Sequence, residues 1–191
     1  MAEDKCMSEQ MRETLEPRPT VLVVEDDPVN LRIFQKILKR RGNFNAIHSE
    51  NVLEIFELTT SGAIDLVLMD VSLTNSRYEN RAVDGLWITK TLKCDPHTHD
   101  LPVILVTANA MVGDRERFLE ESGANDYVSK PIIDQGQFVE LIRKYLAATQ
   151  DLSLNHAPQL ETLRDTPPEL LTQSPHRPDN SVPTFNTPVS L

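Results

Sequence analysis

The chain has 191 residues and a formal net charge of −10, which fits one domain with extensions or two small domains. The acidic balance argues against a nucleic-acid-binding surface and against a basic face for anionic lipid. Cys6 and Cys94 lie far apart and match no zinc or redox spacing, and no apolar stretch is long enough to span a bilayer. We therefore expect a cytoplasmic protein that binds neither membrane nor nucleic acid.

The first expected elements are an arm, a strand and a helix. Residues 1–19 are polar and mixed in charge, which indicates a flexible N-terminal arm. A buried strand follows at 20–25. Asp27 then precedes a proline, a typical helix start in which Asp27 serves as N-cap, and this helix should end at Gly42. Asp27 as a metal ligand is the alternative.

The central strand is expected at 65–70, a continuous apolar run that ends in Asp70. A run without alternation is typical of a parallel strand buried on both faces. A short strand near 44–48 and a helix that ends at Gly62 precede it. A polar loop over 72–84 follows it.

The remaining pattern predicts a helix over 83–93, a strand that begins after Pro102, a helix over 111–122 and a strand over 125–129. The last helix shows the spacing of an amphipathic helix at Phe138, Leu141, Ile142, Tyr145 and Leu146. Five strands alternating with five helices predict an α/β fold with a doubly wound parallel sheet.

The composition changes after residue 148. The segment 149–191 holds seven of the thirteen prolines and no glycine. Its scattered apolar residues cannot bury enough surface to offset the entropy of ordering the chain. We therefore expect a folded domain at 20–148 and a disordered, Pro-rich tail, which is either a plain extension or a docking segment for a partner.

Polar residues stand where the expected strands end: Glu25, Asp26, Asp70, Thr107 and Lys130. The carboxyl ends of parallel strands meet at one edge of the sheet, where open α/β sheets bind ligands. Two carboxylates about 4 Å apart repel by roughly 4 kcal/mol at an effective dielectric near 20, so such a cluster requires a cation or bound protons. Oxygen-only acidic sites suit Mg²⁺. With a lysine and a hydroxyl, they describe a phosphoryl-transfer site whose nucleophile is an aspartate.

Four segments carry a family resemblance: Val-Val-Glu25-Asp26, Leu-Met-Asp70, Val-Thr107-Ala and Ser-Lys130-Pro131. In this order and spacing they resemble the receiver domain of bacterial response regulators, over about residues 20–148. The resemblance implies a flavodoxin-like sheet of order 2-1-3-4-5. It also implies a stand-alone phosphorylation switch of two-component or phosphorelay signalling.

The resemblance assigns the acidic residues to two roles. Asp70 would accept the phosphoryl group. Glu25 and Asp26 would form the acidic pair around Mg²⁺, with Asp26 as the direct ligand. Asp70 and the backbone carbonyl of Ser72 would complete the protein ligands.

The resemblance also assigns the other strand ends. Thr107 and Lys130 would contact the phosphoryl oxygens, and Tyr127 stands at the position of an aromatic switch residue. The family commonly has a cis peptide bond before the proline that follows this lysine, here Pro131.

The implied partners are a sensor histidine kinase or phosphotransfer protein as phosphodonor and a downstream protein as target, with a second copy of the chain after phosphorylation. No output domain is visible, because no helix-turn-helix, catalytic or zinc pattern occurs. The chain would therefore be no enzyme beyond its own phosphorylation and dephosphorylation.

Other interpretations compete with this one. Haloacid dehalogenase phosphatases also use a strand-end aspartate, but their second acid two residues on is Ser72 here. A phosphorylation-independent scaffold would not need the full acidic, Thr and Lys set. Two histidines and two aspartates in 95–100 suggest either a metal site or a polar connection. Trp87 either packs on its helix or faces a partner. The loop 73–83 is longer than in the family, either as a tolerated insertion or with a role in kinase choice or shielding.

Overall fold

The computed structural model describes residues 18–108, 111 and 113–155. Residues 1–17 and 156–191, which hold most of the expected arm and tail, lie outside the described residues. The last helix, α6, spans Gln135–Asn155 and so continues past the domain end expected at 148. No helix in the described part of the chain is both long and apolar enough to cross a membrane.

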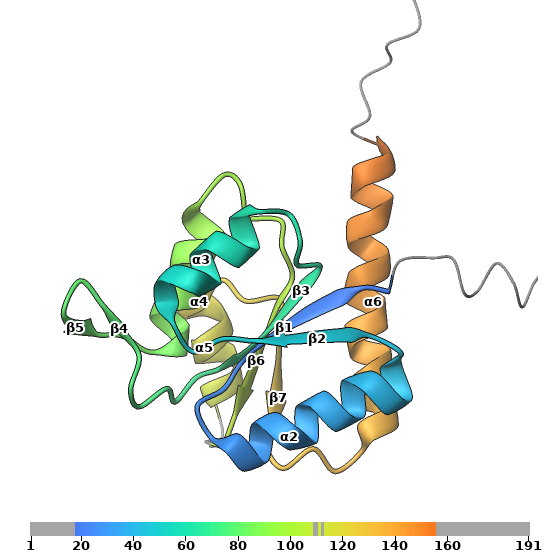
Figure 1. Ribbon diagram of the computed structural model, residues 1–191, viewed down its shortest axis with the longest axis horizontal. Coiled ribbons are helices and arrows are strands. Elements are labelled where there is room, and N and C mark those ends of the chain that lie inside the picture. The colour runs from blue at the N-terminus through green and yellow to red at the C-terminus, as the bar shows by residue number, and fades with distance from the viewer. Residues whose placement is uncertain (1–17, 109–110, 112, 156–191) are drawn as a thin grey trace, which may run out of the picture. The chain divides into compact units, whose positions relative to one another are not determined.

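A five-stranded parallel sheet forms the centre of the domain (Figure 1). Its strand order, β2-β1-β3-β6-β7, confirms the predicted order 2-1-3-4-5. Strands β3 and β6 are buried along their whole length, as their continuous apolar sequences require. The strands are β1 (Thr20–Val24), β2 (Asn45–His48), β3 (Leu66–Asp70), β6 (Val103–Thr107) and β7 (Asp126–Ser129).

Helix α2 (Pro28–Ile37) begins as predicted, because the carboxylate of Asp27 accepts hydrogen bonds from the N–H groups of Val29 and Asn30 at 2.8 and 2.9 Å. Asp27 is therefore an N-cap. The helix does not continue as an α-helix to Gly42, because it widens into one π-helical segment, η1 (Leu38–Gly42). Gly42 is required there, since a Cβ atom would lie 2.3 Å from the Phe44 ring.

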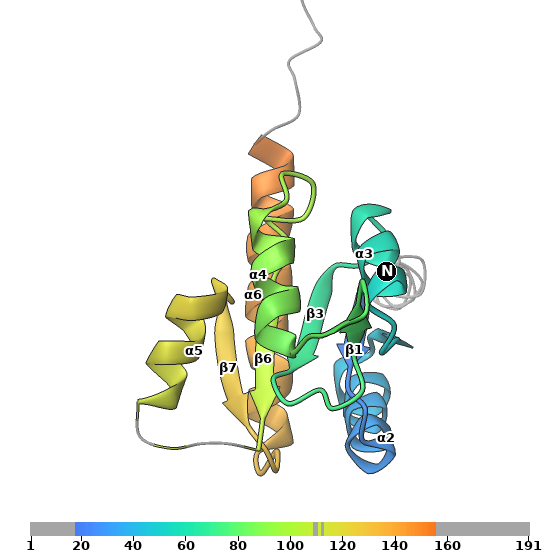
Figure 2. The same ribbon diagram turned by 90° about the vertical axis from the view of Figure 1, so that its left-hand side faces the viewer.

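Helices cover both faces of the sheet (Figure 2). Alternate strand residues point to opposite faces. Val23 and Leu68 pack with α2 and α6, whereas Leu22 and Met69 pack with the other three helices. Those three are α3 (Val52–Thr60), α4 (Gly85–Cys94) and α5 (Asp114–Ser122).

The loop after β3 is more ordered than the sequence indicated. It contains a small antiparallel hairpin, β4 (Arg77–Tyr78) and β5 (Arg81–Ala82), where only a polar loop was expected. Its turn residues Glu79 and Asn80 have φ angles of 48° and 65°, a left-handed turn that matches the twist of paired strands. We call residues 72–84, from the end of β3 to the start of α4, the insert.

Candidate functional site

The three predicted carboxylates come together at the carboxyl edge of the sheet. Glu25 and Asp26 follow β1, and Asp70 ends β3, whose register with β1 pairs Val24 with Met69. One oxygen from each carboxylate lies within 4.8 Å of the others. Glu25 and Asp70 are 2% and 5% exposed, so their charges are poorly solvated and need compensation.

Lys130, which follows β7, supplies a positive charge to this cluster. Its Nζ lies 2.8 Å from Oε2 of Glu25 and 2.9 Å from Oδ2 of Asp70. Burial alone would lower the pKa of Lys130, but its hydrogen bonds to the two carboxylates raise the pKa overall. The ammonium group is therefore charged at neutral pH and lies against the carboxylate of Asp70.

Glu25 has a mixed environment. Burial, together with the charge of Asp70, raises its pKa, although hydrogen bonds from Lys130 and Asn30 act in the opposite direction. The Nδ2 group of Asn30 lies 3.3 Å from Oε1 of Glu25, and the His48 ring lies 2.9 Å from the Glu25 backbone oxygen. Neither Asn30 nor His48 was predicted as a site residue, because each depends on contacts between elements.

Asp26 is held by the insert. The backbone N–H of Thr74 donates to its Oδ2 at 2.9 Å, and the Thr74 hydroxyl donates to the same atom. Burial alone would raise the pKa of Asp26, but the Thr74 hydrogen bonds outweigh it and lower the pKa. Asp26 therefore carries its charge readily, as a cation ligand must.

A close backbone approach fixes Asp70. A Cβ atom on Gly85 would lie 1.9 Å from the Asp70 carbonyl oxygen, so only glycine fits where α4 begins. The Gly85 N–H donates to the Val71 oxygen at 3.2 Å. The Ser72 N–H donates to Oδ1 of Asp70 at 3.2 Å. The sequence carried one signal for Gly85, its place after Asp84, the N-cap of α4.

Thr107 and Tyr127 occupy adjacent strands. Thr107 is fully buried at the end of β6, and its carbonyl accepts a hydrogen bond of 2.8 Å from the Lys130 N–H. Tyr127 is half-buried on β7, with its ring centroid 6.2 Å from that of Phe118 in α5. The Lys130–Pro131 bond is cis, as the resemblance implied.

The residues in 95–100 form a connection and no metal cluster. The Asp95 carboxylate accepts a hydrogen bond of 2.8 Å from the His97 N–H, and His99 pairs with Asp100 at 3.2 Å. Among the described residues, the one group of three or more acidic, His or Cys side chains close enough to share an ion is the cluster at the sheet edge.

Residues 21–143 match the family described as response regulator receiver domain. The polar-differentiation response regulator DivK of Brucella anthropi is 39% identical over 127 residues, which is 66% of this chain and 95% of that protein. The chain belongs to the response regulator receiver family. The DivK protein of Brucella ovis is 38% identical over the same shares of both chains.

Two solved structures share the fold of this chain. The receiver domain of a sensor histidine kinase from Pseudomonas aeruginosa PAO1 has 26% identity and a TM-score of 0.57, and the match covers 69% of this chain and 99% of that chain. That structure has a magnesium ion in its active site cleft. A response regulator structure from Chloroflexus aurantiacus has 24% identity and a TM-score of 0.59, with 69% and 99% coverage, and shares the fold.

Proposed function

We propose that this receiver domain is a phosphorylation-dependent switch that accepts a phosphoryl group on Asp70. The donor is a sensor histidine kinase or a phosphotransfer protein, and the phosphorylated chain acts on a downstream protein or on a second copy of itself. We also propose that the protein is cytoplasmic and binds neither nucleic acid nor membrane. The observation that carries the proposed switch is the contact of Lys130 with both Asp70 and Glu25.

The acidic cluster fits Mg²⁺, because all its side-chain donors are carboxylate oxygens within 4.8 Å of one another. Asp26 and Asp70 would be the direct side-chain ligands. Glu25 and the Ser72 carbonyl would complete the set of protein groups around the ion. When bound, Mg²⁺ supplies positive charge that offsets the carboxylates and the phosphoryl oxygens.

The residues of the chain supply the rest of the reaction. An Asp70 carboxylate oxygen forms a bond to phosphorus as the bond between phosphorus and the donor's histidine nitrogen breaks. The charge on the transferred group is then shared with the Lys130 ammonium and the Thr107 hydroxyl. Lys130 already lies 2.9 Å from Asp70, whereas the Thr107 hydroxyl, at the end of the neighbouring strand β6, would move toward the transferred group.

The first prediction is that Asp70 is the sole site of phosphorylation and that labelling needs Mg²⁺. We would incubate the full chain with acetyl phosphate and Mg²⁺ and measure intact mass. Asp70→Asn should abolish the added mass, and Asp26→Asn should weaken metal binding and labelling together. Asp27→Asn is the matched control, since asparagine also caps helices, the Asp27 carboxylate caps α2, and the substitution keeps the backbone N–H that Asp27 donates to Glu25.

Two outcomes would contradict the proposal. Undiminished labelling of the Asp70→Asn protein would place the phosphoryl group elsewhere. A wild-type chain that takes up no phosphoryl group at all would favour the phosphorylation-independent scaffold.

A further inference from the structure

The insert contacts the acidic cluster at two residues, because the Ser72 N–H donates to Asp70 and Thr74 donates to Asp26. Both hydrogen-bond donors of Thr74, its N–H and its hydroxyl, point to Oδ2 of Asp26. The two residues are 48 positions apart in sequence. Thr74 is exposed, so water could satisfy its hydroxyl, and the contact with Asp26 is not forced by burial.

The rest of the insert holds Thr74 in place from both sides. On the N-terminal side, Leu73 is 7% exposed and belongs to the core. On the C-terminal side, the Val83 N–H closes the base of the hairpin on the Ser76 oxygen at 3.0 Å. Thr74 therefore presents its donors from a fixed backbone.

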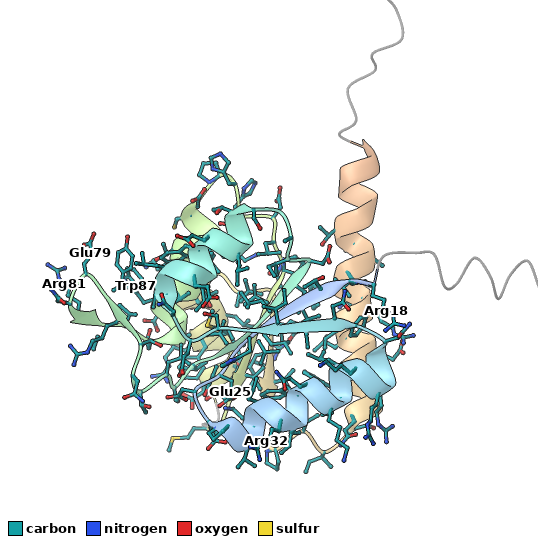
Figure 3. The ribbon with its side chains drawn as sticks, in the orientation of Figure 1. Arg18, Glu25, Arg32, Glu79, Arg81 and Trp87 are labelled. Carbon is teal, nitrogen blue, oxygen red and sulfur yellow. The ribbon has the colours of Figure 1, made fainter. Side chains whose placement is uncertain are left out.

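The hairpin in turn packs on two helices. The ring centroid of Tyr78 lies 5.7 Å from that of Phe56 in α3 and 5.4 Å from that of Trp87 in α4. Figure 3 shows Glu79 and Arg81 at the outer end of the hairpin and Trp87 at its base. These contacts fix the insert as a whole against the domain.

The number of bonds that a carboxylate oxygen can accept determines how the Thr74 contact affects Asp26. A carboxylate offers about four lone-pair sites over its two oxygens. Two donors from Thr74 occupy those of Oδ2, which leaves Oδ1 as the atom that can take a cation. Hydrogen bonds to a ligating carboxylate orient it, and their loss typically costs 10–100-fold in metal affinity.

We propose that Thr74 is a positioning residue for the divalent cation, so that the insert orients a side-chain ligand of the cation site in addition to supplying the Ser72 carbonyl. By holding Oδ2, Thr74 fixes the Asp26 carboxylate with Oδ1 toward the cluster. This inference rests on the proposed function, because it requires that Asp26 binds the cation.

The test measures the affinity of the full chain for Mn²⁺, which prefers the same oxygen ligands as Mg²⁺, from the electron paramagnetic resonance signal of the free ion. Thr74→Val keeps the shape and the backbone N–H but removes the hydroxyl, and it should weaken Mn²⁺ binding roughly tenfold, the lower end of the usual range. Thr74→Ser should restore wild-type affinity. Thr60→Val, which removes an exposed hydroxyl from α3, should not change it.

Each result has one meaning. Unchanged affinity in Thr74→Val, with normal wild-type binding, overturns the positioning role and leaves the proposed function intact. Tighter binding also overturns it, because Thr74 would then compete with the cation. Absence of Mn²⁺ binding by the wild-type chain overturns both the metal part of the proposed function and this inference.

Discussion

Lys93, in the last turn of α4, places its side chain in an environment that disfavours its charge. Its Nζ donates to the backbone oxygens of His99 at 3.1 Å and Leu101 at 2.7 Å. Burial lowers the pKa of Lys93 to about 8, although the charge of Asp100 partly opposes this shift. A neutral amine can still donate both hydrogen bonds, so the contact survives the loss of the charge.

This pKa predicts a rise in stability with pH. Between about pH 8 and pH 10.5 the unfolded chain binds more protons at this position than the folded chain, so the free energy of unfolding should increase across that window. Below it both states are protonated, and the dependence disappears. We would measure urea denaturation of the wild type and of Lys93→Met from about pH 7 upward.

The free energy of unfolding of the wild type minus that of Lys93→Met should increase with pH. Lys90→Met, which removes an exposed lysine from the same helix, serves as control and should give a flatter difference. Parallel curves for the wild type and Lys93→Met would show that the burial of Lys93 does not perturb its titration.

The strand pattern of the sequence could predict the site residues that end strands, but not those that lie in loops. Asp70 and Lys130 end apolar strands, and the rule that parallel strands bind ligands at their carboxyl ends was enough to bring them together. Thr74 lies inside a polar loop without periodicity. Its contact with Asp26 depends on how the insert folds, and no local pattern records that. The sequence predicted no role for Gly85, because its close approach to the Asp70 backbone depends on how α4 packs against β3.

At the scale of the elements, the hairpin is the main feature that the sequence did not predict. Its strands have two residues each, too few for alternation, and its turn residues Glu79 and Asn80 include no glycine. Tertiary contacts stabilise the hairpin, because the Tyr78 ring packs against those of Phe56 and Trp87. The expectation of a plain polar loop is therefore corrected, because the segment contains a short antiparallel hairpin. Trp87 packs in this cluster and is 38% exposed, and its alternative role facing a partner stays a prediction.

The aromatic cluster predicts a clear difference between two substitutions. Tyr78→Ala removes the ring from a half-buried site, and it should lower the free energy of unfolding by about 1–3 kcal/mol, below the 3–5 kcal/mol typical of fully buried rings. Tyr78→Phe keeps the ring contacts and should change it by less than about 0.5 kcal/mol. Urea denaturation followed by circular dichroism measures both, and equal losses for the two variants would contradict the packing role.

At the scale of the whole domain, β6 and β7 connect the site to the helices on the face that bears α4 and α5. Thr107 ends β6, and Tyr127 pairs with Leu105 one strand over. We expect phosphorylation to draw Thr107 toward the phosphoryl oxygens and Tyr127 inward, which would reshape the surface of α5, β7 and α6. A shift from 1:99 to 99:1 needs about 5.5 kcal/mol, and one hydrogen bond to a charged group supplies roughly 1.5–3 kcal/mol. Several contacts must therefore act together.

Nuclear magnetic resonance can test this coupling with beryllofluoride, a mimic of the phosphoryl group. The Tyr127 signals of the wild type should shift when beryllofluoride and Mg²⁺ are added. In Thr107→Ala they should shift less, while labelling at Asp70 persists. A full wild-type response in Thr107→Ala would rule out this route from the site to the surface.

The hydrogen-bonded base of the hairpin determines which part of the insert can change in sequence and length. Backbone hydrogen bonds from Val83 to the Ser76 oxygen and from Gly85 to the Val71 oxygen fix the ends of the hairpin, and Tyr78 fixes it against α3 and α4. Each doubling of a flexible loop costs only about 0.6 kcal/mol in closure entropy. Longer sequences could therefore replace the turn residues Glu79 and Asn80 while Tyr78 and the ends of the hairpin are kept, which makes this turn suitable for grafting a foreign peptide onto the domain.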